Sequence, residues 1–194
     1  TYLPLRLSFV NEATRLSEYS GANLTDVLKG VGLDSRIGSH YFRPSPSWGG
    51  SCFPKDLVEV NNFYNQDELT LPLISNIIGS NKEHLQWTVN QLLSLKRNNG
   101  LKRIVLVGAA FKEDTDDLRN SPTLDIYKLL NEMEEEVMIL DTEIDVPNYQ
   151  SIKQLDEVPE YSLLSIMYPV KEELNKNISN YANNNECIIY YPWS

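Results

Sequence analysis

The sequence predicts an α/β protein made of an all-helical half followed by a half with a parallel sheet. In the first half, apolar residues recur every three or four positions, as on one face of a helix. In the second half, short continuous apolar runs alternate with helical segments, which is typical of buried parallel strands joined by crossover helices. We therefore expect two domains, at residues 1–98 and 99–194, divided before the turn at Gly100.

Each helix expected in the first half has apolar residues along one face. The helices cover residues 1–18, 24–31, 54–64 and 73 to about 98. Asn23 is suited to cap the second of them, and Gly32 to end it. Between the second and third helices lies a segment rich in Ser, Pro and Gly, which we expect to be irregular.

The strands expected in the second half are continuous apolar runs. They cover residues 103–108, 137–140, 163–167 and 187–190, with a helix at 122–130. Ligands of such sheets bind beyond the carboxyl ends of the strands, here the loop from Gly108 to Arg119. Since no Gly-x-Gly-x-x-Gly follows any strand, the sequence does not predict a complete dinucleotide site.

Composition narrows the classes of partner. The net charge of −10 argues against nucleic acid or an anionic membrane, although a local basic cluster can still bind a phosphorylated ligand. No apolar run approaches the roughly 20 residues of a membrane span. His40 and His84 lack metal-like spacing, so no metal is expected. Cys52 and Cys187 do not suggest a disulfide framework, which favours a cytoplasmic location.

The most informative stretch is Gly49-Gly50-Ser51-Cys52-Phe53-Pro54-Lys55-Asp56. Pro54 fits the first turn of a helix, so Cys52 is expected near a helix N-terminus. Free amide groups there, and a nearby cation such as Lys55, stabilise a thiolate. From local chemistry alone, Cys52 is equally well read as a reactive cysteine or as an ordinary buried thiol.

This stretch is followed in the second half by Phe111-Lys112-Glu113-Asp114-Thr115-Asp116-Asp117-Leu118-Arg119-Asn120-Ser121-Pro122. Together with Leu33-Asp34-Ser35-Arg36-Ile37-Gly38, the two motifs resemble the UDP-glucose/GDP-mannose dehydrogenase family over essentially the whole chain. The cysteine motif looks more like the UDP-glucose 6-dehydrogenase type than the N-acetylhexosamine branches.

The resemblance implies a central helical dimerisation domain followed by a Rossmann-like domain that binds UDP. The family's N-terminal NAD-binding domain would be absent from this chain, which starts at Thr1 within a helical pattern, so we expect a piece of a longer enzyme, inactive alone. The implied reaction oxidises the C6 alcohol of a nucleotide sugar to a carboxylate in two hydride transfers to NAD⁺, by way of an aldehyde and a cysteine thioester.

The resemblance also implies roles for individual residues. Cys52 matches the nucleophile, Asp56 a carboxylate near the hydrolytic water, and Lys55 a cation beside the thiol, sugar or cofactor. The residues matched to substrate binding are Arg36, reaching into the partner subunit's sugar site, and Tyr41, Arg43, Ser47, Trp48, Gly49, Phe111 and Lys112. Arg119 matches a contact to NAD. Asp116 and Asp117 are expected to organise their loop or cap the next helix.

The sequence leaves alternatives for the sugar and for the role of the chain. The family's last strand ends in an arginine that segment 190–194 lacks, so either that contact is lost or the sugar is not glucose. The chain is either part of an enzyme that makes polysaccharide precursors, or a non-catalytic module that binds nucleotide sugar or only dimerises. A homodimer is expected because Arg36 would act across it and the long helix needs a partner.

Overall fold

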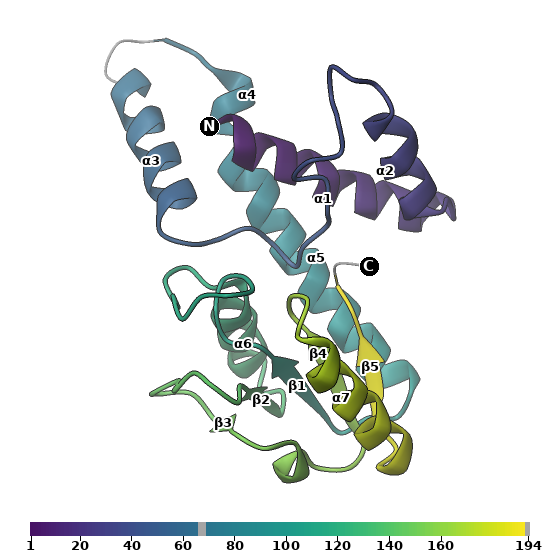
Figure 1. Cartoon of the computed structure of the whole chain (residues 1–194). Coiled ribbons are helices and arrows are strands. Elements are labelled where there is room, and N and C mark those ends of the chain that lie inside the picture. The colour runs from purple at the N-terminus through teal and green to yellow at the C-terminus, as the bar shows by residue number, and fades with distance from the viewer. Residues whose placement is uncertain (66–68, 193–194) are drawn as a thin grey trace.

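The computed structural model of the chain describes residues 1–65 and 69–192. Its elements fall into two groups (Figure 1). The helical group comprises α1 (Tyr2–Ser20), α2 (Leu24–Gly32), α3 (Cys52–Asn65), α4 (Pro72–Ser75) and α5 (Ile77–Asn98). The α/β group comprises β1 (Arg103–Val107), α6 (Pro122–Glu132), β2 (Val137–Leu140), β3 (Ser151–Ile152), η1 (Leu155–Glu157), β4 (Ser162–Ile166), α7 (Glu172–Asn184) and β5 (Ile188–Tyr190). The predicted fold class is confirmed.

The strands form one parallel sheet in the order β3-β2-β1-β4-β5. Val107 at the end of β1 pairs with Leu140 of β2 on one side and with Ile166 of β4 on the other. The carboxyl ends of these three strands therefore meet at one edge. Since the chain crosses from one side of β1 to the other between β3 and β4, this edge is the switch point where parallel sheets commonly receive ligands.

Two boundaries in the helical half differ from the prediction. Helix α3 begins at Cys52 itself and not at Pro54, because a proline in the first turn lacks only an N–H that has no helical partner there. The periodic run after Leu71 is also interrupted, since Asn76 separates α4 from α5. The predicted cap of α2 is confirmed, with the Asn23 side chain accepting from the Asp26 N–H at 3.0 Å.

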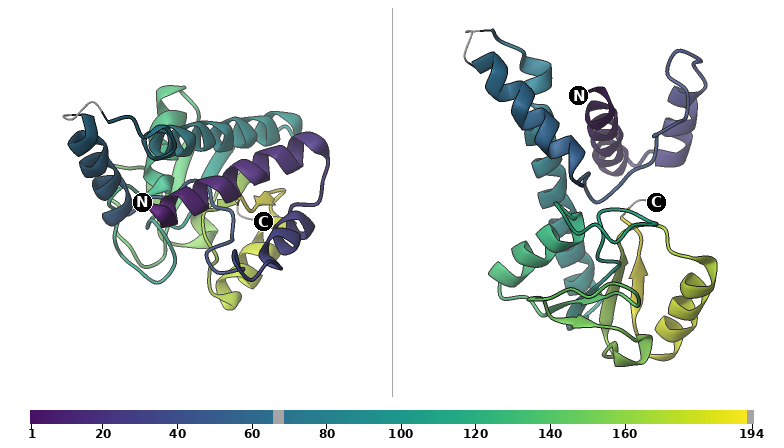
Figure 2. Two further views of the ribbon diagram at one scale, coloured as in Figure 1. Left: turned by 90° about the horizontal axis from the view of Figure 1, so that it is seen from above. Right: turned by 60° about the vertical axis from the view of Figure 1, so that its left-hand side comes forward.

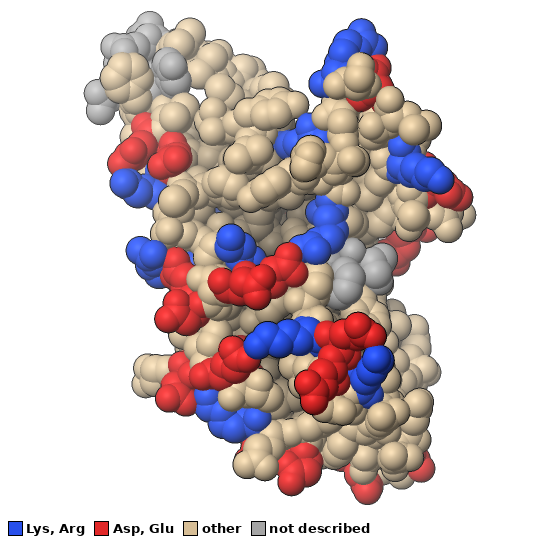
Figure 3. All heavy atoms as spheres, viewed as in Figure 1, with Lys and Arg blue, Asp and Glu red and all other residues tan. Residues whose placement is uncertain are grey.

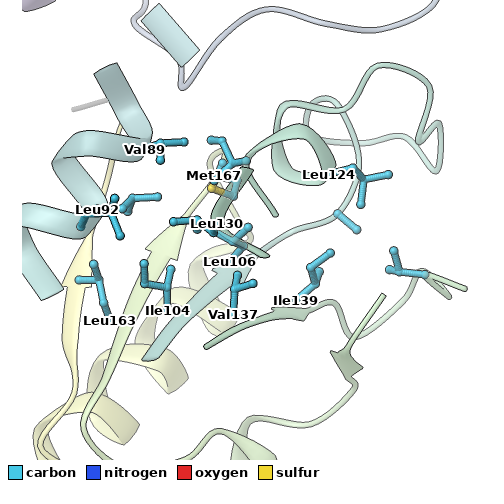
Figure 4. Packing of buried hydrophobic residues seen from close by; sticks show 14 of the residues in the cluster. Val89, Leu92, Ile104, Leu106, Leu124, Leu130, Val137, Ile139, Leu163 and Met167 are labelled. Carbon is cyan, nitrogen blue, oxygen red and sulfur yellow. The ribbon is translucent and has the colours of Figure 1, made fainter. Parts of the chain in front are cut away.

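Helix α5 packs against both groups. Ile77 near its start lies in a cluster with Trp48 and Leu57 of the helical half. Val89 and Leu92 near its end are fully buried in the core that covers one face of the sheet (Figure 4). Two further views show α5 running from one half into the other (Figure 2). Its apolar stripe is core within a single chain, so the long helix by itself gives no reason to expect a dimer.

None of the helices in the described part of the chain combines the length and the apolar character needed to cross a bilayer.

Candidate functional site

A cleft of about 670 Å³ lies where the two halves meet. One wall is the irregular segment 39–49 of the helical half, and the other is formed by residues 110–114 after β1 and by Met167, Tyr168 and Pro169 after β4. Figure 3 shows acidic and basic side chains interleaved along the middle of the face drawn there. The cleft thus combines a loop of one half with the switch-point edge of the sheet in the other.

Seven of the eight residues predicted to bind the substrate line this cleft. They are Tyr41, Arg43, Ser47, Trp48, Gly49, Phe111 and Lys112. The eighth, Arg36, lies outside it, with its side chain 87% exposed and paired in a fork with Asp34 at 3.0 and 2.6 Å. The hydrogen bonds from Arg36 lower the pKa of the Asp34 carboxyl. The Arg36 guanidinium is therefore accessible to solvent or to another molecule, and it does not line the cleft of its own chain.

Two cationic side chains of the cleft are positioned to bind a diphosphate. Arg43 donates to Glu113 across the boundary between the halves at 3.2 Å, with its side chain about half exposed. Lys112 is exposed, and its ammonium lies 5.6 Å from the centre of the Phe111 ring. Both cations are within reach of solvent, so a phosphate can compete for them without first breaking a buried ion pair.

Trp48 lines the cleft, but most of its side chain is packed in the core of the helical half. Its ring N–H donates to Ser8 at 2.9 Å, and its backbone exchanges hydrogen bonds of 3.0 and 2.8 Å with the Asn81 side chain. The ring also meets Phe53 edge to face at 6.2 Å. With only 7% of Trp48 exposed, it can offer a ligand little more than a backbone contact and a ring edge.

The cysteine loop is docked directly on the second half. A Cβ on Gly49 would lie 1.9 Å from the carbonyl oxygen of Asn120, and one on Gly50 would lie 2.9 Å from the Phe111 ring. Gly50 adopts φ 87°, in the left-handed region that favours glycine. The paired glycines are thus required by close packing between the two motifs that the sequence singles out.

Cys52 is the first residue of α3 and is exposed. The structure therefore contradicts the reading of Cys52 as a buried thiol. Its sulfur lies 3.7 Å from the Ser51 hydroxyl, at a helix end where amide groups lack helical partners. Asp56, one turn later, and Lys55 are also exposed, and Lys55 lies 4.0 Å from Glu59. All three predicted catalytic residues border the cleft loop, but none of them lines the cleft.

Arg119 is held by its own loop. Its guanidinium donates to both oxygens of Asp117 at 2.9 and 2.8 Å, and its backbone N–H donates to the same carboxylate. These bonds lower the pKa of Asp117 to about 2. Asp117 thus organises the loop, as expected, whereas the residue preceding α6 is Ser121, whose hydroxyl donates back to the Ala109 carbonyl at 2.6 Å.

The carboxyl end of β1 lacks the glycine-rich turn of a dinucleotide site. A Cβ on Gly108 would lie 2.6 Å from the Tyr168 ring, and both residues line a second cleft of about 400 Å³. Asp141 at the end of β2 could have met a ribose, yet its carboxylate accepts from the N–H groups of Ala109, Glu143 and Ile144 at 2.8 to 3.0 Å. The contact of Arg119 with NAD stays a prediction.

In the part of the chain that the structure describes, no three His, Cys, Asp or Glu side chains are placed to hold a metal ion. His84 is buried, with its Nε2 2.8 Å from the Ser45 carbonyl and its ring stacked on Trp87. Its contact with Ser45 holds the cleft segment against α5. Residues 193–194 of the C-terminal segment, which bears on the choice of sugar, lie outside the described residues.

Sequence reasoning overlooked three residues that shape this site. Glu113 pairs with Arg43, Asn120 bonds to Gly50, and Tyr168 covers Gly108. Asn120 gave one signal, because asparagine before a Ser-Pro helix start tolerates left-handed backbone. The partners of all three come from distant segments, so local pattern could not identify them.

Comparison with known proteins matches both halves of the chain to the family that the sequence motifs resemble. Residues 1–83 match the model of the UDP-glucose/GDP-mannose dehydrogenase family, central domain, and residues 105–188 that of the same family's UDP binding domain. The UDP-glucose 6-dehydrogenase of Rickettsia felis is 37% identical over 131 residues, covering 67% of this chain and 29% of the relative. The UDP-glucose 6-dehydrogenase TuaD of Bacillus subtilis is 34% identical over 160 residues, covering 82% and 34%.

Solved structures agree on the fold. A UDP-glucose dehydrogenase from Pyrobaculum islandicum superposes with a TM-score of 0.78 at 26% identity, covering all of this chain and 45% of that one. A UDP-D-ManNAc dehydrogenase from Pyrococcus horikoshii gives 0.81 at 21% identity, covering 100% and 46%, which bears on the fold alone. The chain spans about a third of the length of its curated relatives. With both halves matched by successive domains of one family, this chain belongs to the UDP-glucose/GDP-mannose dehydrogenase family.

Proposed function

We propose that this chain supplies the nucleotide-sugar site and the reactive cysteine of an NAD-dependent UDP-hexose 6-dehydrogenase, acting on UDP-glucose in polysaccharide precursor synthesis. The observation that carries the proposal is the cleft between the halves, lined by seven residues that the family motifs assign to the substrate. Its two exposed cations oppose the net charge of −10 and suit a diphosphate. The UDP-glucose 6-dehydrogenases among the relatives favour that sugar.

In this proposal Cys52 is the nucleophile. Its thiolate adds to the C6 aldehyde to give a thiohemiacetal, and loss of a hydride from that carbon leaves a thioester that water hydrolyses. NAD⁺ supplies the hydride acceptor. Asp56 lies one helical turn from Cys52 and would orient the water, while Lys55 would offset the negative charge of the sulfur. An exposed thiol at a helix N-terminus is consistent with this role.

We divide the chain at residues 98 and 99 into a helical dimerisation domain and a nucleotide-sugar-binding domain. Helix α5 joins them, so the two are expected to move as one unit. The free thiols of Cys52 and Cys187 suit a cytoplasmic location. The matched domains are the central and the UDP binding domain, so we propose that these 194 residues act as part of a longer enzyme in which another domain binds NAD.

Calorimetric titration with UDP-glucose, GDP-mannose and UMP tests the binding proposal. Preference for UDP-glucose is the expected result, because the cleft, both cations and the cysteine loop are all present in this chain. Preference for GDP-mannose would reassign the sugar. Failure of all three to bind would contradict the proposed cleft and favour the second candidate, a dimerisation module whose cysteine is idle.

Substitution of Lys112→Gln localises the binding site. Loss of a charge-assisted contact to phosphate is worth about 1.5–3 kcal/mol, so UDP-glucose should bind about tenfold more weakly or worse. Lys176→Gln is the matched control, because Lys176 is an exposed lysine on α7, paired with Glu172 and outside the cleft lining. Equal affinity of both variants would show that the diphosphate is bound elsewhere.

The chain alone is expected to be inactive. No Gly-x-Gly-x-x-Gly follows any expected strand of the sequence, so NAD⁺ is not expected to be held next to the sugar. NAD⁺ and UDP-glucose added to the purified chain should yield no NADH, as followed by absorbance. Turnover by the chain itself would contradict this expectation and would require a dinucleotide site within these residues.

A further inference from the structure

The loop that carries Cys52 is held from the other half of the molecule. Gly50 lies two residues before Cys52, and both of its backbone polar groups are engaged by Asn120. The Gly50 N–H donates to the Asn120 carbonyl at 3.4 Å, and the Asn120 side-chain amide donates to the Gly50 carbonyl at 3.0 Å. Asn120 of the second half therefore holds the cysteine loop by two hydrogen bonds to the same residue.

The backbone of Asn120 is shaped for this contact. Asn120 adopts φ 48°, a left-handed conformation that asparagine tolerates better than most residues. This conformation directs its carbonyl oxygen to within 1.9 Å of where a Gly49 Cβ would stand. The contact thus favours an asparagine or glycine at position 120 and requires a glycine at position 49.

We infer that Asn120 is a positioning residue that holds the loop before Cys52 and, with it, the first turn of α3. This inference rests on the proposed function, since it concerns the reactivity of the proposed nucleophile. Cys52 follows this loop as the first residue of α3, where amide groups without helical partners stabilise a thiolate.

The test is the alkylation rate of Cys52 by iodoacetamide in the whole chain, measured by peptide mass spectrometry with Cys187 as the internal reference. Asn120→Gly removes the amide that bonds Gly50 while preserving the left-handed backbone and adding no charge. Asn148→Gly is the matched control, because Asn148 is an exposed asparagine with φ 70° in the loop between β2 and β3. Both variants carry the same entropic cost of an added glycine.

Asn120→Gly is expected to slow the alkylation of Cys52 about threefold, the size of the stabilisation that a helix N-terminus gives a thiolate, with Cys187 unchanged. Asn148→Gly should leave both rates as in the parent chain. If Cys52 in Asn120→Gly reacts as fast as in the control, or faster, the inference is wrong. Faster reaction of Cys187 in one variant would reveal unfolding, and the comparison is then repeated with Asn120→Ser at a lower temperature, where the same threefold slowing is required.

The outcome is separable from that of the proposed function. Absence of UDP-glucose binding by the parent chain would remove the proposed function but leave a slowed Cys52 in Asn120→Gly as evidence for positioning. Conversely, tight binding of UDP-glucose with no effect of Asn120→Gly on the thiol would retain the function and remove the positioning role.

Discussion

His84 lies beneath the cleft segment, and its environment favours the neutral ring. Its Nε2 contacts the Ser45 carbonyl at 2.8 Å, while its Nδ1 is buried without a hydrogen-bond partner. Burial lowers the pKa of His84 from 6.5 to about 4, against the opposing effect of the Ser45 carbonyl. A proton therefore cannot be added to this ring in the folded protein without a cost in stability.

The fold should accordingly lose stability as the pH falls from about 6.5 to about 4. In that window the unfolded chain binds a proton at His84 that the folded chain does not, which amounts to about 3 kcal/mol once both forms are protonated. His84→Gln can still donate to Ser45 but does not titrate. Urea unfolding at about pH 7 and about pH 4 should show a smaller loss of stability in that variant than in the parent.

His40 provides the control for this measurement. It is the other histidine and is exposed, so His40→Gln should retain the full pH dependence of the parent chain. Carboxylates contribute a background that is common to all three proteins, and the difference between them isolates His84. An identical loss of stability in parent and His84→Gln would mean that the buried ring accepts its proton without strain.

At the scale of elements, α5 determines whether the two halves unfold together. Leu92 is fully buried between α5 and the sheet, so Leu92→Ala should lower the free energy of unfolding by about 2–5 kcal/mol. Since α5 also packs on the helical half, far-UV circular dichroism and tryptophan fluorescence should report one coincident transition. Trp48 and Trp87, two of the three tryptophans of the chain, contribute fluorescence from that half.

Leu73→Ala is the control for this prediction. Leu73 on α4 is 65% exposed, and its truncation should change stability by less than about 0.5 kcal/mol. Two separate transitions, or a Leu92→Ala effect confined to the sheet, would show that α5 is divided between two independent cores.

Elements were predictable where one local signal decided them. Val137–Leu140 is a strand because four apolar residues follow a turn, and Asn23 begins α2 because its side chain satisfies a free N–H. The errors fell where two signals compete. Pro54 marks a first helical turn without stating how many residues precede it, and the break at Asn76 interrupts a periodic pattern that continues on both sides.

At the scale of the whole molecule, the sequence singled out residues that the structure gathers in one cleft, but it did not predict their arrangement. Motif resemblance selected Arg43 and Lys112 from distant segments, and the structure brings them into one cleft. The pairing of Gly50 with Asn120 depends on how two halves dock, which no periodicity encodes. Nor could spacing reveal that the Tyr168 ring packs against Gly108.

An exposed apolar face on α1, and not the long helix α5, supports the proposed homodimer. Tyr2, Phe9 and Leu16 recur every seven residues, which places them on one face of α1, and they are 65, 52 and 66% exposed. An apolar line of this kind is suited to a second copy of the same helix. The exposed Arg36 guanidinium would then be free to exchange Asp34 for a ligand in the partner's cleft.

Sedimentation over a concentration series tests this arrangement. The parent chain should be a dimer, and Leu16→Glu should weaken association at least about tenfold, because an unpaired carboxylate would be buried against an apolar face. Met133→Glu, at an exposed apolar residue just after α6, should leave the dimer intact. A parent chain that stays monomeric at every concentration would remove the face on α1 as an interface, and with it the role of Arg36 across the dimer. The cleft and its cations would then have to bind the nucleotide sugar within one subunit.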